Sequence, residues 1–251
     1  QEQIRAHDLN GIALVPGPNK LYISGIHTHL SERPIILFIP AVGVPAIIIP
    51  TLEAMKAQNA GIPQNRIFDW NDQEGHASAF QQASEILGLN EWKLGVEALH
   101  MRVLELDLLR QVAPDLQYTH AEPIMDILRA VKDDTEIAAM EKAIAVAESA
   151  IQSLLPQIKI GMSEKQVAAM LTQLLMDGGA ESIAFGPIVA SGPNSASPHA
   201  YPTARPLQEG DLLVIDWGVY VDGYPSDITR TFAVGEIDDE LKQIYEIVRA
   251  S

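Results

Sequence analysis

Short apolar runs alternate with amphipathic segments through the first 120 or so residues of the chain. Runs of four or five apolar residues, bounded by Pro and Gly, predict short buried strands. Between these runs, apolar residues recur at helical spacing, and glycine marks a helix stop. The alternation predicts an α/β layer domain, with a mixed sheet and flanking helices. The expected strands are residues 12–15, 21–24, 35–39, 46–49, 66–70 and 92–96, and the expected helices are residues 51–59, 76–87 and 101–112.

Two longer helices follow this region. Asp133 and Glu136 have the spacing of a capping box, so a helix begins there, and Pro156 ends it. Ser163 is expected to cap a second helix, and Gly178 is expected to stop it. Helical spacing predicts a core-facing stripe on each helix. The stripes are Ile137, Met140, Ile144, Ala147, Ile151 and Leu154 on the first helix, and Val167, Met170, Leu171 and Leu174 on the second.

The stretch 211–234 predicts a β-hairpin, because two strand-like segments flank an Asp-Gly turn signal. Side chains alternate across a strand, so pairing back through the turn places Asp216 opposite either Asp227 or Thr229. Carboxylates brought together in this way repel each other, and they are costly to desolvate among apolar neighbours. A bound divalent cation removes both costs. The alternative is a solvated Asp216 on an edge strand, with Asp227 capping a turn.

Composition narrows the classes of function. The 251 residues allow one large domain or two ordinary ones. The net charge of −16 argues against binding to nucleic acid or to an anionic membrane. The absence of cysteine excludes disulfides, thiolate zinc sites and a cysteine nucleophile. We expect a cytoplasmic protein, because neither a signal peptide nor an apolar run of membrane-spanning length is present.

Three motifs, in order over about fifty residues, resemble the pita-bread metallohydrolases, which include methionine aminopeptidases, prolidases, Xaa-Pro aminopeptidases and creatinases. The run with Pro18, Asn19, Tyr22, Ser24 and Gly25 also resembles the N-terminal domain of creatinases and prolidases. The three motifs are Phe185-Gly-Pro-Ile-Val-Ala-Ser-Gly192, Asn194-Ser-Ala-Ser-Pro-His199, and Asp216-x-Gly218 followed by Asp227-Ile-Thr-Arg-Thr231.

The resemblance implies two domains. Residues 1–125 would form the creatinase-like α/β N-terminal domain, and residues 126–251 would form the first half of an α+β pita-bread catalytic domain. The family holds metal with two Asp, one His and two Glu, of which Asp216 and Asp227 match the first two. No His follows His199 in this sequence. We therefore expect a fragment of a protein roughly a hundred residues longer, inactive by itself.

By the same resemblance, the expected activity is metal-dependent hydrolysis of peptides with proline in the second position. Asp216 and Asp227 would hold two divalent ions (Mn, Co or Zn) in the complete protein, and the fragment alone would bind none. His199 would be catalytic, donating a hydrogen bond to the scissile amide or to the developing oxyanion.

Three further residues are candidates for substrate binding. Tyr201 and Arg205 follow His199 and are candidate substrate contacts, as is His27 in the N-terminal domain. The family also implies a homodimer and a peptide substrate. A different class of function remains open, namely a non-catalytic pita-bread-like binding module.

Overall fold

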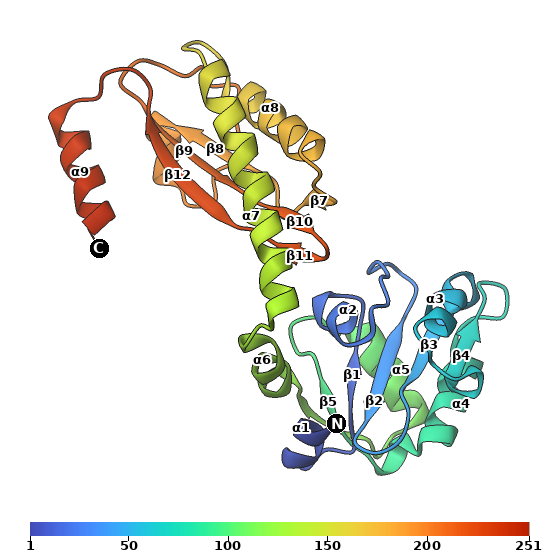
Figure 1. Cartoon of the computed structure of the whole chain (residues 1–251). Helices are drawn as coiled ribbons and strands as arrows, with labels where there is room; N and C mark the ends of the chain where they lie inside the picture. Colours follow the sequence, from blue (N-terminus) through green and yellow to red (C-terminus); the bar gives the residue numbers. More distant parts are fainter. Residues whose placement is uncertain (251) are drawn as a thin grey trace. The chain divides into compact units, whose positions relative to one another are not determined.

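The computed structural model describes residues 1–250 and divides into two compact units, Gln1–Val131 and a unit that begins at Lys132 (Figure 1). The sequence-based boundary at residues 125 and 126 lies inside helix α6 (Glu122–Ala130). Ile124 and Met125 of this helix are buried in the core of the first unit. Since burying these side chains ties the whole helix to that core, the structural boundary follows the helix instead of cutting it.

A six-stranded sheet forms the centre of the first unit, with strand order β4-β3-β2-β1-β5-β6 (Figure 1). The pairs β1–β2 and β2–β3 are antiparallel, and the other pairs are parallel. The mixed sheet that the sequence predicted is confirmed. The strands are β1 (Gly11–Leu14), β2 (Ile36–Pro40), β3 (Ala46–Pro50), β4 (Ile67–Trp70), β5 (Lys93–Val96) and β6 (Gln117–His120).

Helices cover both faces of this sheet. Successive residues of β2 point to opposite faces, so Leu37 joins one buried cluster and Phe38 joins the other. Helices α1 (Glu2–Ala6), α3 (Ala54–Asn59) and α6 contribute to the first cluster. Helices α4 (Ala77–Leu87) and α5 (Val103–Val112) contribute to the second. The fully buried central strands follow from this double cover.

The predicted strand at residues 21–24 is wrong, because this segment belongs to helix α2 (Pro18–Ser24). Pro18 occupies the first turn, where its missing N–H costs nothing, and Gly25 ends the helix with a left-handed φ of 66°. The buried Lys20 side chain donates to the carbonyl of Ile26 at 2.6 Å, just past the helix end. The helix start and stop signals therefore decide the structure of this apolar run.

The second unit packs two long helices against one face of a three-stranded antiparallel sheet ordered β12-β9-β8 (Figure 1). A smaller sheet, ordered β11-β10-β7, continues the hairpin. The helices are α7 (Asp134–Leu154), α8 (Glu164–Asp177) and α9 (Asp239–Ala250). The strands are β7 (Ser182–Ile183), β8 (Ile188–Ser191), β9 (Leu212–Trp217), β10 (Val219–Val221), β11 (Tyr224–Pro225) and β12 (Ile228–Ala233). Short 3₁₀ turns are η1 (Thr51–Glu53), η2 (Gln64–Arg66), η3 (Leu89–Glu91), η4 (Leu155–Gln157) and η5 (Gly192–Ala196).

The predicted capping box of Asp133 with Glu136 forms, and so does the predicted cap at Ser163, which the structure extends to a capping box with Gln166. The predicted stripe on α7 is wrong at two positions, because Ile137 and Ile144 are 45% and 39% exposed. The buried stripe is built mainly of alanines. Their small side chains let the helix lie close to the sheet, where the Trp217 indole N–H donates to a helix carbonyl at 3.0 Å. The buried residues of α7 are Ala139, Ala143, Ala147, Ala150, Ile151 and Leu154.

Helix α9 differs from α7 and α8 in having no buried residue. Its apolar Ile244 and Val248 are 47% and 70% exposed. Within residues 1–250, no helix has both the length and the apolar character needed to cross a membrane.

Candidate metal centre

Strand β9 places Asp216 at the middle of the three-stranded sheet. Its direct partners are Thr229 on β12 and Ile188 on β8. Of the two registers left open by the sequence, the structure has the one with Asp216 opposite Thr229. Asp227 lies two residues before Thr229, which makes it a diagonal neighbour of Asp216 on the same face. The Thr229 hydroxyl donates to Asp216 Oδ1 at 2.9 Å.

Gly218 maintains this register through a close backbone approach. A Cβ added at Gly218 would lie 2.0 Å from the carbonyl oxygen of Ser226. Ser226 in turn joins Val219 by a backbone hydrogen bond of 2.8 Å, and its hydroxyl accepts from the Val219 N–H at 3.1 Å. Glycine two residues after Asp216 is therefore a steric requirement of the strand that delivers Asp227.

The face of the sheet decides the environment of Asp216. Leu213, Ile215 and Trp217 point into the core beneath α7 and α8, so the alternate residues of β9, including Asp216, lie half-buried on the other face. This desolvation raises the pKa of Asp216 above its ordinary value.

Neighbouring groups adjust this shift in both directions. The hydrogen bond from Thr229 opposes the rise in the Asp216 pKa, and the carboxylate of Asp227 adds to it. The charge of His199 acts weakly against the rise. The two carboxylates lie on the face of the sheet that α7 and α8 leave uncovered, a setting that favours a bound cation.

His199 and Tyr201 lie on the loop between η5 and β9, and both side chains are exposed. The Arg205 guanidinium donates to both carboxylate oxygens of Asp211, at 2.6 and 2.8 Å, and to the Ser191 hydroxyl at 2.6 Å. These bonds give Arg205 a supporting role at the base of the loop. A substrate contact by Arg205 stays a prediction.

Two acidic residues near this loop, Glu164 and Asp211, are buried in a way that the sequence does not signal. Glu164 occupies the first turn of α8, where an acidic residue ordinarily lies on the solvated surface. Asp211 directly precedes strand β9, a position where an aspartate is typical of a turn. Both are buried in the structure, and no spacing in the sequence signals that.

His27 belongs to the first unit, where it is exposed beside His29, with ring centroids 5.0 Å apart. The structure gives these rings an edge-to-face contact with each other. A substrate contact by His27 stays a prediction.

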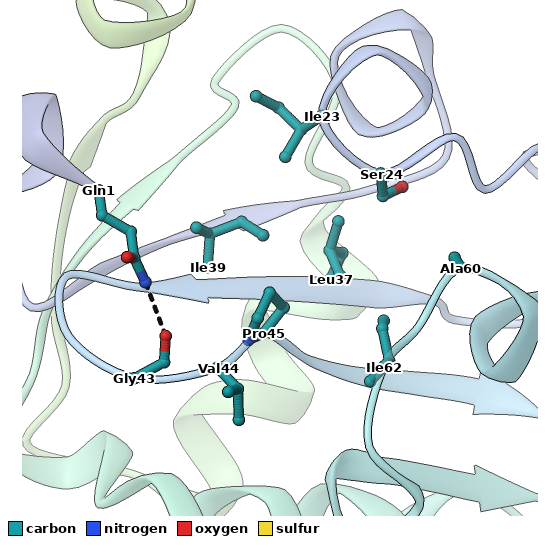
Figure 2. A pocket seen from close by; sticks show the side chains of 10 residues that line it. All are labelled: Gln1, Ile23, Ser24, Leu37, Ile39, Gly43, Val44, Pro45, Ala60 and Ile62. Carbon is teal, nitrogen blue, oxygen red and sulfur yellow. Dashed lines mark hydrogen bonds between the residues drawn. The ribbon is translucent and has the colours of Figure 1, made fainter.

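A hollow of about 390 Å³ in the first unit offers a competing location (Figure 2). Its wall is made of apolar side chains such as Ile39 and Ile62, and the Gln1 amide donates to the Gly43 carbonyl at 2.7 Å across one side. None of its lining side chains is an acid or a base. The hollow therefore lacks the groups that proton transfer or metal binding requires. The full lining is Gln1, Ile23, Ser24, Leu37, Ile39, Gly43, Val44, Pro45, Ala60 and Ile62.

The donor set at Asp216 fits a hard divalent cation, because carboxylate oxygens are its preferred ligands. Among residues 1–250, no group of three or more His, Asp or Glu side chains gathers as a ready metal site. A tight site built on Asp216 and Asp227 would therefore require further ligands.

The structure is thus a two-domain protein with a pair of candidate metal-binding carboxylates on the less covered face of its β12-β9-β8 sheet. Residues 1–131 match the creatinase/prolidase N-terminal domain, and residues 138–251 match metallopeptidase family M24. The chain therefore belongs to metallopeptidase family M24, in the branch that carries the creatinase/prolidase N-terminal domain.

Relatives in this family are named as dipeptidases. The probable dipeptidase PepE of Mycobacterium tuberculosis is 34% identical, over 96% of this chain and 64% of the relative. The Xaa-Pro dipeptidase of Pyrococcus horikoshii is 31% identical, over 96% of this chain and 65% of the relative. The chain thus spans a little under two thirds of the length of these curated relatives.

Solved structures agree with the fold. The crystal structure of recombinant prolidase from Thermococcus sibiricus has a TM-score of 0.92 and 29% identity, covering 99% of this chain and 67% of that one. The dipeptidase structure from Pyrococcus horikoshii has a TM-score of 0.88 and 31% identity, covering 99% and 68%. The family and the two-domain fold expected from the sequence are confirmed.

Proposed function

We propose that the full-length protein is a metal-dependent peptidase that hydrolyses peptides with proline in the second position. The observation that carries the proposal is the register of the β12-β9-β8 sheet, which sets Asp216 opposite Thr229 and so makes Asp227 its diagonal neighbour on the less covered face. The names of the relatives, which include Xaa-Pro dipeptidase and prolidase, support the choice of substrate.

Asp216 and Asp227 would hold divalent metal, with Mn, Co and Zn as the candidate ions and two ions as the expected number. Such an ion supplies Lewis acidity and lowers the pKa of water. The Thr229 hydroxyl orients Asp216 through its hydrogen bond. His199, on an exposed loop, would donate to the oxygen that gains charge during amide hydrolysis. Exposed Tyr201 is a candidate contact to the peptide.

The test is Asp227→Asn in the full-length protein, with Asp222→Asn as the matched control. Asp222 lies on the same hairpin, but its carboxylate is exposed and pairs with Lys142 at 2.6 Å. We expect Asp227→Asn to lower kcat/KM by more than about 100-fold, beyond the usual cost of losing an outer-sphere partner, and to reduce bound metal. Asp222→Asn should leave both unchanged.

The measurements are proline release from an Xaa-Pro dipeptide with added Mn²⁺, and metal content after dialysis. Full activity and full metal content in Asp227→Asn would refute the ligand assignment. Equal turnover of a matched Xaa-Ala dipeptide would refute the preference for proline. It would still support peptidase activity.

A second candidate is peptide binding without hydrolysis. The partial ligand set within residues 1–250 favours it. It predicts that the full-length protein binds an Xaa-Pro peptide but releases no proline with any of the three metals. The homodimer and the substrate contact by His27 remain predictions, which sedimentation and His27→Ala kinetics would test.

A further inference from the structure

Glu164 is a buried acid that is not among the candidate metal ligands. It is the first residue of α8, directly after the Ser163 cap, and its side chain has no exposed surface. Negative charge at a helix N-terminus is favoured by the helix dipole, yet complete burial of a carboxylate requires several hydrogen-bond donors.

Those donors come from the two ends of the loop that carries His199. Oxygen Oε1 accepts from the N–H and the hydroxyl of Ser191, at 2.7 and 2.8 Å, where β8 ends and the loop begins. Oxygen Oε2 accepts from Asn194 Nδ2 at 2.9 Å, and from the N–H and hydroxyl of Thr203 at 2.9 and 2.6 Å, where the loop returns. One carboxylate therefore joins both ends of the loop to one helix.

Burial by itself would raise the pKa of Glu164. The hydrogen bonds from Thr203 and Ser191 outweigh burial, and the pKa lies below its ordinary value. The carboxylate is thus charged at neutral pH, and its five bonds are charge-assisted, which makes them stronger than bonds between neutral groups.

Other bonds extend this anchor. The Ser191 hydroxyl, which donates to Glu164, also accepts from Arg205, whose guanidinium is paired with Asp211. The helix N–H groups of Glu164 and Lys165 donate to the carbonyls of Arg205 and Thr203, each at 3.1 Å. Apart from the short η5 turn, the loop around His199 has no regular structure that could place it.

We propose that Glu164 is the positioning residue for His199, holding the loop 192–203 so that the imidazole stays beside Asp216 and Asp227. The proposal rests on the proposed role of His199 in peptide hydrolysis. Glu164 lies at the loop base and acts through the loop, without touching the substrate.

The test uses Glu164→Gln in the full-length protein, with Glu97→Gln as the matched control. The glutamine keeps the shape of the side chain but turns an NH₂ group toward donors that need an acceptor. Glu97 is 1% exposed and accepts from the Val15 N–H and from Asn19, both at 2.9 Å, in the first unit. It is therefore an equally buried acid that is unconnected to the loop.

We expect Glu164→Gln to lower kcat on an Xaa-Pro dipeptide by about 10- to 100-fold, as for loss of a supporting outer partner, with bound metal unchanged. Glu97→Gln should stay within about twofold, because it leaves the His199 loop intact. Adding Glu164→Gln to His199→Ala should cause no further loss, since both changes remove the same contribution. Losses that multiply in the double variant would overturn the proposal, because they would mean that Glu164 acts independently of His199.

Hydrogen exchange separates this proposal from the proposed function. In Glu164→Gln, amides of residues 192–203 should exchange faster while those of β9 stay protected. Unchanged protection of the loop would overturn the positioning role, whatever the activity. If the unsubstituted protein hydrolyses no peptide but Glu164→Gln still speeds exchange in the loop, the proposed function is refuted. The role of Glu164 in holding the loop would then stand. Glu164→Asp, which keeps the charge but shortens the reach, should give intermediate kcat and exchange if Glu164→Gln does not fold.

Discussion

The six-stranded sheet of the first unit and the β12-β9-β8 sheet of the second unit differ in how many faces their helices cover. In the first unit, apolar residues of β1, β2 and β3 enter one of two buried clusters on opposite faces of the sheet. In the second unit, β9 alternates between buried and half-buried residues, because α7 and α8 pack on one face only. Asp216 lies on that less covered face, whereas the fully buried central strands β1, β2 and β3 of the first unit have no such face.

The difference shows how a scaffold makes room for chemistry. A strand buried on both faces stabilises the fold but leaves no position where a charged group can meet solvent or a ligand. A half-covered strand gives up some apolar burial and gains a row of alternate positions on a rigid support. Asp216 occupies one of these positions, and Thr229 and Asp227 occupy neighbouring ones.

The largest expected effect compares isoleucines on the two sheets. Ile48→Ala removes a fully buried side chain from β3 and should cost about 4 kcal/mol in the free energy of unfolding. Ile188→Ala removes a half-buried side chain beside Asp216 and should cost about 1 kcal/mol, because part of the side chain is already solvated.

The measurement is urea unfolding followed by tryptophan fluorescence, with Trp217 reporting on the second unit and Trp70 and Trp92 on the first. Variants that retain one reporter at a time would separate the transitions. Equal losses at Ile48 and Ile188 would contradict the contrast between the two sheets.

A medium effect is expected at the hairpin. Gly218→Ala places a Cβ against the Ser226 carbonyl and should cost about 3 kcal/mol, because the paired backbones must separate. The matched control is Gly223→Ala at the turn, where a φ of 77° adds strain but the added Cβ meets open space, so about 1 kcal/mol is expected. Thermal unfolding of both variants tests the comparison. If Gly218→Ala is no less stable than Gly223→Ala, the backbone near Ser226 can move to make room for the added Cβ at little cost.

The smallest effect concerns pH. The folded pKa of Asp216 lies above its unfolded value, so its contribution to stability is complete below the unfolded pKa and is lost as pH rises through the folded pKa. Without metal and with chelator present, Asp216→Asn should therefore raise the Tm at pH 7 and leave it nearly unchanged at pH 3. Added Mn²⁺ should raise the Tm of the unchanged protein and have no effect on Asp216→Asn. A lower Tm for Asp216→Asn at pH 7 without metal would contradict the conclusion that the charged form of Asp216 destabilises the folded state.

Local rules in the sequence were sufficient for much of the second unit. Asp133 with Glu136 and Ser163 with Gln166 mark helix starts because capping is satisfied within four residues of chain. The hairpin also follows from local pattern, since the Asp-Gly turn and the alternation of β-branched residues both favour it. The family motifs around His199, Asp216 and Asp227 lie in these same local stretches.

Where long-range packing decides, the pattern was less informative. The run at residues 21–24 is apolar enough for a strand, yet Pro18 and Gly25 bound it as a helix. On α7, the larger side chains Ile137 and Ile144 indicated a core face. The close approach of the sheet instead buries the neighbouring face of the helix, which carries mainly alanines.

By itself, the sequence determined the family and the order of the main elements, and it marked Asp216, Asp227 and His199 as candidate site residues, because each is encoded in contiguous motifs. The tertiary structure alone decided the register of Asp216 against Thr229, the pairing of Arg205 with Asp211 and the burial of Glu164. These features depend on segments that are up to 39 residues apart, such as Glu164 and Thr203, and meet only when the chain is packed. A buried charge has the same letter in the sequence as a solvated one, and only the donors that surround it in the fold distinguish the two.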